Sequence, residues 1–300
     1  MHTDATEPAV TATEGDRRTS SEAAPFRTSV MLWTVGTDVP FDQRLEWIAD
    51  AGYRSAELVG EYAGWSERDF HRHNDKRRDL GIGFDCTASA MVAPGRSRHN
   101  AADPRQREDF LADVRAELRA MEKIDCPEMV VLGGDAVPGL DRRAQRASCV
   151  ETLKRAAELA ESAGVTILLG NVDAEENRDY LARSVVDAFK IVAEVGHPHV
   201  KLRYDFSHAQ ISGGNLIANL ERHLDLVGKV HIGDVPGHHE ADTGEIKFTN
   251  IYSKLAEVGY DGYVAMELVP TGDPVRTLAR AREATLLADK LQAGEKRADA

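Results

Sequence analysis

Three polar residues in the C-terminal half stand where short apolar segments end or are interrupted. Asp205 follows one such segment, His231 interrupts the next and Glu267 closes a third. Two carboxylates and an imidazole suit a divalent ion such as Mn²⁺, Mg²⁺ or Co²⁺, because these ions accept oxygen-rich sites. Taken singly, a strand-end Asp can cap a helix, a His between apolar residues can belong to the core, and a Glu can pair with an Arg. Their positions on three successive strands favour a shared metal site.

Two other groups of polar residues lie near these positions. His208 follows Asp205 by three residues, an offset that can direct both side chains into one site as the chain leaves a strand. A loop histidine in solvent explains the same offset. The run 236–245 (PGHHEADTGE) contains several possible ligands and two turn glycines, so a polar loop that covers a substrate or is solvated explains it better than a second metal site.

The segments that must position these residues alternate regularly along the chain. Apolar or β-branched runs predict strands at 29–35, 55–59, 82–87, 129–132, 165–169, 200–204, 229–232 and 262–267. Helical patterns follow each of them, at 41–51, 66–80, from the predicted cap Asp103 onward, and at 141–163, 184–195, 215–226, 250–258 and 274–293.

Apolar strands separated by helices indicate a parallel sheet covered by helices. Eight such units are what a (β/α)₈ barrel requires. A doubly wound open sheet is the alternative, but no Gly-x-Gly-x-x-Gly turn follows the first strand. The sequence therefore predicts a single TIM barrel, with its site at the carboxyl ends of the strands.

The composition of the chain and the residues near its two ends restrict the extent of this barrel, its partners and the compartment in which we expect it. Residues 1–24 have no periodic apolar face and no uninterrupted apolar segment of the kind a secretory signal needs, so we expect a disordered tail, a barrel over 25–293 and a short tail over 294–300. The net charge of −13 opposes nucleic-acid binding, and the apolar runs are too short to span a membrane. Three widely spaced cysteines are typical of a reducing compartment, which predicts a cytoplasmic protein without nucleic-acid or membrane partners.

Several blocks of the C-terminal half resemble hydroxypyruvate isomerases. They are 202–208 (LRYDFSH), 230–237 (VHIGDVPG), 243–246 (TGEI) and 262–267 (GYVAME), and the similarity covers most of 29–290. These enzymes belong to the xylose isomerase-like barrel superfamily, which includes the ketose 3-epimerases. The resemblance implies one divalent metal ion, held by a Glu, an Asp, a His and a second Glu from strands five to eight. It also implies an acid/base pair formed by the two Glu residues, and a homo-oligomer.

Individual roles follow from the same resemblance. Asp205, His231 and Glu267 match the family's Asp, His and second Glu, so Glu267 would be both metal ligand and catalytic base. Glu176 and His208 match residues that bind substrate hydroxyls. His238 stands where the family usually has an Arg that reaches the substrate.

One position departs from the family pattern. The block 167–173 (ILLGNVD) resembles the segment that carries the first Glu, but Gly170 occupies that place. One coordination position then falls to water or to a neighbour such as Asp173, and the ion should be held more weakly. Epimerisation needs bases on both faces of the substrate, whereas isomerisation through a cis-enediol can use Glu267 alone.

The sequence thus predicts a metal-dependent isomerase of a small hydroxy-carbonyl compound, either hydroxypyruvate-like or a short ketose, that acts through an enediolate. Three alternatives stay open at this point. The same site could serve a sugar-ketone lyase or dehydratase, it could serve a 3-epimerase, or Gly170 could mark a catalytically impaired protein that binds a sugar without converting it.

Overall fold

Eight parallel strands close into a barrel in the computed structural model, which describes residues 26–88, 92–93, 96–97, 99–173, 175 and 177–298. Around the barrel the order is β1, β2, β3, β6, β7, β8, β9, β10 and back to β1. The bounds are β1 (Arg27–Met31), β2 (Ser55–Leu58), β3 (Gly83–Ala88), β6 (Glu128–Val131), β7 (Thr166–Gly170), β8 (Val200–Asp205), β9 (Val227–Ile232) and β10 (Tyr263–Met266). The predicted TIM barrel is confirmed; the predicted tail over 1–24 lies outside the described residues.

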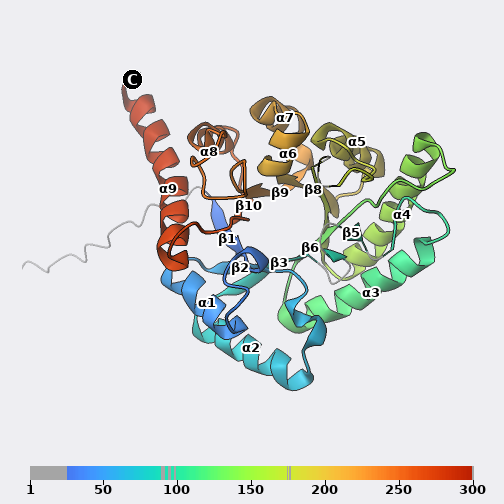
Figure 1. Ribbon diagram of the computed structural model, residues 1–300, viewed down its shortest axis with the longest axis horizontal. Coiled ribbons are helices and arrows are strands. Elements are labelled where there is room, and N and C mark those ends of the chain that lie inside the picture. The colour runs from blue at the N-terminus through green and yellow to red at the C-terminus, as the bar shows by residue number, and fades with distance from the viewer. Residues whose placement is uncertain are drawn as a thin grey trace, which may run out of the picture.

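Helices surround the ring of strands (Figure 1). They are α1 (Phe41–Asp50), α2 (Glu67–Asp79), α3 (Arg107–Ile124), α4 (Arg142–Ser162), α5 (Val185–Val195), α6 (Phe206–Ser212), α7 (Leu216–His223), α8 (Phe248–Glu257) and α9 (Pro274–Ala298). Short elements add η1 (Leu32–Thr34), η2 (Glu61–Gly64), η3 (Leu224–Leu226) and the antiparallel pair β4 (Val92–Ala93) and β5 (Arg96–Ser97). Among the residues that the structure describes, no helix has the length and apolar character needed to cross a membrane.

Side-chain caps explain why several helices begin where the sequence predicts. Ser66 and Asp69 form a reciprocal capping box at the start of α2. Asp141 accepts hydrogen bonds from two backbone amides of α4, and Ser184 accepts one from α5. Each bond satisfies an amide that has no partner within its own helix, and this fixes the first turn.

The structure differs most from the sequence prediction at four places. Asp103 was expected to cap the third helix, but α3 begins only at Arg107, because residues 103–106 form a separate hydrogen-bonded turn. The strand expected at 29–35 ends at Met31, where the chain enters η1. An additional short helix, α6, follows β8 directly, and α9 continues to Ala298 instead of ending at 293.

The apolar interior has two parts. The larger one lies between the sheet and the surrounding helices, and a smaller cluster is formed by Cys86, Ala88, Val130 and Leu168. The small cluster comes from β3, β6 and β7, whose side chains point alternately outward to the helices and into the barrel. The barrel centre is therefore packed with side chains. Polar groups lie among them at the carboxyl ends of the strands and also deeper in the barrel, where Lys229 meets Asp85 and Glu128.

Asp103 stabilises the turn before α3 and gives a testable pH effect. Its carboxylate is buried and accepts hydrogen bonds from the side chain and backbone amide of Arg105, which lower its pKa from 3.8 to about 2. A depressed folded-state pKa contributes stability that is present above about pH 4 and lost as the pH falls toward 2. We expect Asp103→Asn to lower the free energy of unfolding by about 1–2 kcal/mol at pH 7, and by less at pH 3.5. Urea unfolding at both pH values tests this, with the exposed Asp261→Asn as control; equal losses at both pH values would contradict it.

Candidate active site

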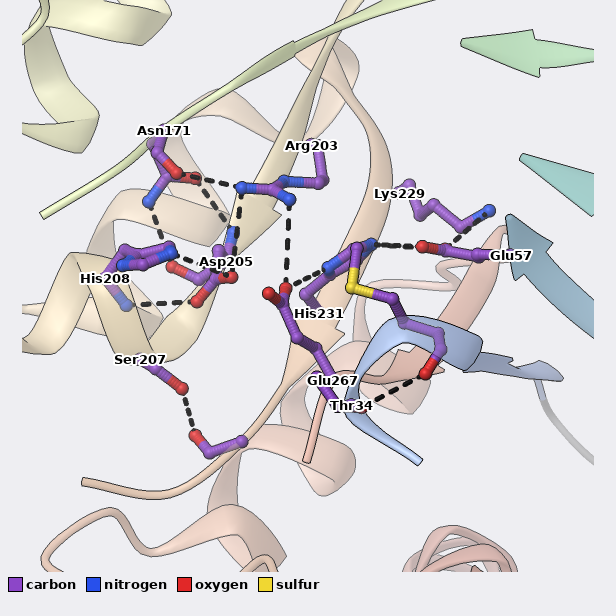
Figure 2. Close-up of polar contacts among 12 residues, drawn as sticks. Thr34, Glu57, Asn171, Arg203, Asp205, Ser207, His208, Lys229, His231 and Glu267 are labelled. Carbon is purple, nitrogen blue, oxygen red and sulfur yellow. Dashed lines mark hydrogen bonds and ion pairs between the residues drawn. The ribbon is translucent and has the colours of Figure 1, made fainter. Parts of the chain in front are cut away.

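The three residues singled out by their strand positions converge at one end of the barrel (Figure 2). Asp205 is the last residue of β8, His231 lies near the end of β9, and Glu267 follows β10 directly. Asp205 and His231 are register partners on adjacent strands. All three side chains are buried, and one ligand atom from each lies within 4.8 Å of the others.

His231 is held between two carboxylates. Its Nδ1 lies 2.6 Å from Glu267 Oε2, and its Nε2 lies 3.1 Å from Glu57 Oε1. Burial alone would lower the pKa of His231, but the negative charge of Glu57 and the hydrogen bonds to both carboxylates raise that pKa to about 9. The imidazole is therefore fixed in orientation by Glu57 on one side and faces Glu267 with the other nitrogen.

A buried ionic network lies behind His231. Lys229, two residues earlier on β9, has no exposed surface, and its Nζ lies 3.0 Å from Glu57 Oε1 and 3.1 Å from Glu128 Oε2. It also bonds Asp85, whose other oxygen accepts a 2.6 Å hydrogen bond from Ser29. Burial would raise the pKa of Glu57, but the charges of His231 and Lys229 lower it to about 2. Glu57 is thus ionised and joins the network to the active centre.

Arg203 brings a positive charge into the same centre. Its Nη1 lies 3.7 Å from Glu267 Oε2 and its Nη2 lies 4.0 Å from Asp205 Oδ2 (Figure 2). Nη2 also donates a 3.1 Å hydrogen bond to the backbone carbonyl of Asn171. Burial alone would raise the pKa of Glu267, but the hydrogen bond from His231 and the charge of Arg203 hold it well below the ordinary value.

The predicted substrate-binding residues are only partly accounted for. His208 lies at the centre, with its Nδ1 2.9 Å from Asp173 Oδ2 and its Nε2 3.7 Å from Asp205 Oδ2. The ring of His238 is 5.2 Å from that of His208, measured between centroids. Asp173, a possible replacement ligand, is the residue that orients His208 through this contact. Glu176 lies outside the described residues.

Neither Arg203 nor Lys229 was among the residues that we expected at the site. Each lies two positions before a predicted ligand, Asp205 or His231, and so faces the barrel interior on the same strand. Strands buried on both faces are normally apolar throughout. A charged residue at this spacing within an apolar strand is therefore the sequence signal that would have found both.

The donor set suits a divalent ion held by three protein ligands. Asp205, His231 and Glu267 offer oxygen and nitrogen atoms of the kinds that Mn²⁺, Mg²⁺ and Co²⁺ bind. Asp205 Oδ2 is buried and has no hydrogen-bond partner among the described residues, as expected of an oxygen that meets a cation. A carboxylate behind a ligating histidine, here Glu57, is the usual means of orienting its ring. Gly170 offers no fourth ligand.

This arrangement defines a (β/α)₈ barrel with a carboxylate–histidine centre at the carboxyl ends of its strands. The family described as xylose isomerase-like TIM barrel matches residues 45–286, and the chain belongs to that family. The family predicted from the sequence motifs is thus confirmed.

Individual relatives agree with this assignment. The chain is 32% identical over 238 residues to a 2-oxo-tetronate isomerase of Pectobacterium atrosepticum. The match covers 79% of this chain and 89% of that protein. It is 28% identical over 263 residues to a Danio rerio protein named "Putative hydroxypyruvate isomerase", covering 83% of this chain and 92% of that one. The crystal structure of an AP endonuclease, family 2, from Brucella melitensis has a TM-score of 0.76 at 26% identity, covering 86% of this chain and 98% of that chain. With relatives named as isomerases over most of its length, the chain is an enzyme of the isomerase type.

Proposed function

We propose that the protein isomerises a small hydroxy-keto acid, of the hydroxypyruvate or 2-oxo-tetronate kind, through an enediolate. The names of its relatives support this substrate class. The observation that carries the proposal is that Glu267 lies beside Asp205 and His231, while Gly170, which stands where the family has its other glutamate base, has no side chain to act as one. One base on one face of the substrate suffices for isomerisation, whereas epimerisation needs two.

The reaction moves one proton between neighbouring carbons. Glu267 takes the proton from the carbon that bears the hydroxyl, and the C–H electron pair forms the carbon–carbon double bond of the enediolate. The former carbonyl oxygen receives the negative charge. Transfer of the hydroxyl proton between the two oxygens, and return of the carbon-bound proton from Glu267 to the former carbonyl carbon, gives the isomer, with no atom gained or lost.

Neighbouring side chains fix the geometry of this transfer. Glu57 holds His231 from behind, and Nδ1 of His231 lies 2.6 Å from Glu267 Oε2, so the two side chains present their ligand atoms side by side. We assign the binding of substrate oxygens to His208, which Asp173 orients, and to His238, whose ring is 5.2 Å from that of His208. We also assign Glu176 to substrate binding, as the family resemblance implies. Pre-positioning of this kind lowers the entropic cost of reaching the transition state.

We assign Asp205, His231 and Glu267 as the ligands of one divalent ion, Mn²⁺, Mg²⁺ or Co²⁺. When bound, such an ion polarises carbonyl and hydroxyl oxygens and favours the enediolate.

An isotope experiment tests the proposed reaction. The protein is incubated with hydroxypyruvate or 2-oxo-tetronate in D₂O, with added Mn²⁺ and, separately, with EDTA, and the products are followed by NMR and mass spectrometry. We expect conversion to an isomer of the same formula apart from deuterium taken up at the reacting carbons, and loss of turnover in EDTA. Loss of water from the substrate would show a dehydratase instead. Absence of both conversion and deuterium uptake, with either substrate, would contradict the proposal.

A further inference from the structure

Gly170 and Arg203 are direct neighbours on adjacent strands. They are register partners in the pairing of β7 with β8. A Cβ atom added at Gly170 would lie 3.0 Å from Leu132 Cδ2 and 3.4 Å from Arg203 Nη2. The space in which a side chain at residue 170 would begin is therefore bordered by the guanidinium group of Arg203.

The guanidinium group lies within 4.0 Å of both acidic ligands proposed above. It is 3.7 Å from Glu267 Oε2 and 4.0 Å from Asp205 Oδ2, and the residue is only 5% exposed. Its Nε has no hydrogen-bond partner among the described residues, and neither has Asp205 Oδ2. Because an Arg side chain keeps its proton in proteins, this positive charge is permanent.

We propose that Arg203 is a built-in cation of the active centre and competes with a divalent ion for Asp205 and Glu267, so that the protein binds such an ion weakly. The inference rests on the metal ligands assigned under the proposed function. It makes Arg203 a residue that sets the charge of the centre, a role that neither the sequence pattern nor the relatives' names assign to it.

The charges of the centre support this proposal. Asp205 and Glu267 contribute two negative charges, and Arg203 compensates one of them before any ion arrives. A divalent ion at the same two carboxylates meets a like charge a few ångströms away, where the surrounding protein screens the repulsion poorly. The absence of a carboxylate at residue 170 also weakens the binding of a divalent ion, since the ion has one negative ligand fewer.

The positive charge of Arg203 would also take part in the reaction. A guanidinium group beside Glu267 lies close to the place where the enediolate oxygens develop negative charge. A fixed positive charge in a buried site stabilises such an anion without having to reorganise. Arg203 would therefore supply part of the stabilisation that a bound divalent ion would otherwise provide.

Direct titration with Mn²⁺ tests the competition without relying on activity. Calorimetry on the metal-stripped full chain compares wild type with Arg203→Gln, which removes the charge, and with Arg203→Lys, which keeps it. We expect Arg203→Gln to bind Mn²⁺ roughly 10- to 100-fold more tightly than wild type, the range seen when groups around metal ligands are changed. Arg203→Lys should bind as weakly as wild type. Damage to the fold would weaken binding, so a gain in affinity separates competition from a structural role.

Three outcomes would overturn the proposal. The first is that the wild-type protein retains stoichiometric Mn²⁺ after gel filtration in buffer without metal. This result does not depend on the folding of any variant. The second is unchanged or weaker affinity in Arg203→Gln with a native circular dichroism spectrum. The third is no Mn²⁺ binding in any of the three proteins, which would also remove the assigned ligand set. If Arg203→Gln does not bind Mn²⁺ more tightly but the protein still converts its substrate in D₂O, the competition is refuted and the proposed isomerisation is not. The two proposals can therefore be tested separately.

Discussion

Substitution of Glu267 by glutamine is expected to lower kcat by roughly 10²- to 10⁴-fold, the range typical of losing a general base. Glutamine has nearly the same shape, and its amide oxygen can still accept a hydrogen bond from His231, which lies 2.6 Å from the native Oε2. It cannot take a proton from carbon. The variant should therefore fold normally and lose both isomer formation and deuterium uptake, measured by NMR in D₂O.

Glu257→Gln provides the matched control. Glu257 ends α8, is exposed, and bonds only Lys254 among the ion pairs described. This variant should keep the activity of wild type. If Glu267→Gln kept more than about a tenth of wild-type kcat, Glu267 would be a ligand or orienting group only, because loss of a general base costs at least about 10²-fold.

The main part of the active centre follows from the sequence because of how parallel barrels are built. The carboxyl ends of successive strands lie side by side, so Asp205, His231 and Glu267 can be placed together once their strands are recognised. These strands are short apolar runs with clear ends, and the structure reproduces them within a few residues. For these three residues, the local sequence pattern and the geometry of the barrel are sufficient to predict that the side chains meet.

Contacts across the barrel could not be predicted in this way. Glu57 and His231 are 174 residues apart in sequence, and Lys229 and Asp85 are 144 apart. Whether such side chains meet depends on barrel closure and on register, and the register of β2 against β3 shifts between Ala56 and Glu57. A shift of one residue in a strand reverses the face on which each side chain lies. Strand prediction alone does not contain this information.

Asp205 shows a second reason for the incomplete prediction. The sequence predicts either a ligand or a helix cap for an Asp at the end of a strand, and in the structure the two oxygens of Asp205 have different roles. Oδ1 accepts a 3.0 Å hydrogen bond from the backbone amide of His208 and caps α6, while Oδ2 faces the centre without a hydrogen-bond partner among the described residues. The cap initiates a helix that no apolar periodicity announced, because α6 has only seven residues.

Substitution of Lys229 by methionine is expected to lower the free energy of unfolding by about 3–5 kcal/mol, the cost of leaving buried charges without their partner. Lys229 is completely buried, and its Nζ contacts Glu57, Asp85 and Glu128. Methionine fills a similar volume but supplies no charge, so three carboxylates would lose the cation that they share. Burial would then oppose the ionised forms of Glu57 and Glu128 more strongly, because the charge of Lys229 lowers the pKa of both. Urea unfolding at pH 7, followed by circular dichroism, measures the loss.

Lys190→Met separates this effect from the loss of a surface charge. Lys190 is half exposed on α5 and lies 3.6 Å from Asp187, a pair whose removal should change the stability by less than about 1 kcal/mol. The Lys229 variant should also lose turnover in its folded fraction, because Glu57 Oε1 contacts both Lys229 and His231 and thus connects the network to the ring that holds Glu267. A Lys229→Met protein as stable as the Lys190 variant would show that the three carboxylates are compensated without Lys229. Stability lost with full kcat retained would show instead that the network supports the barrel and does not orient His231.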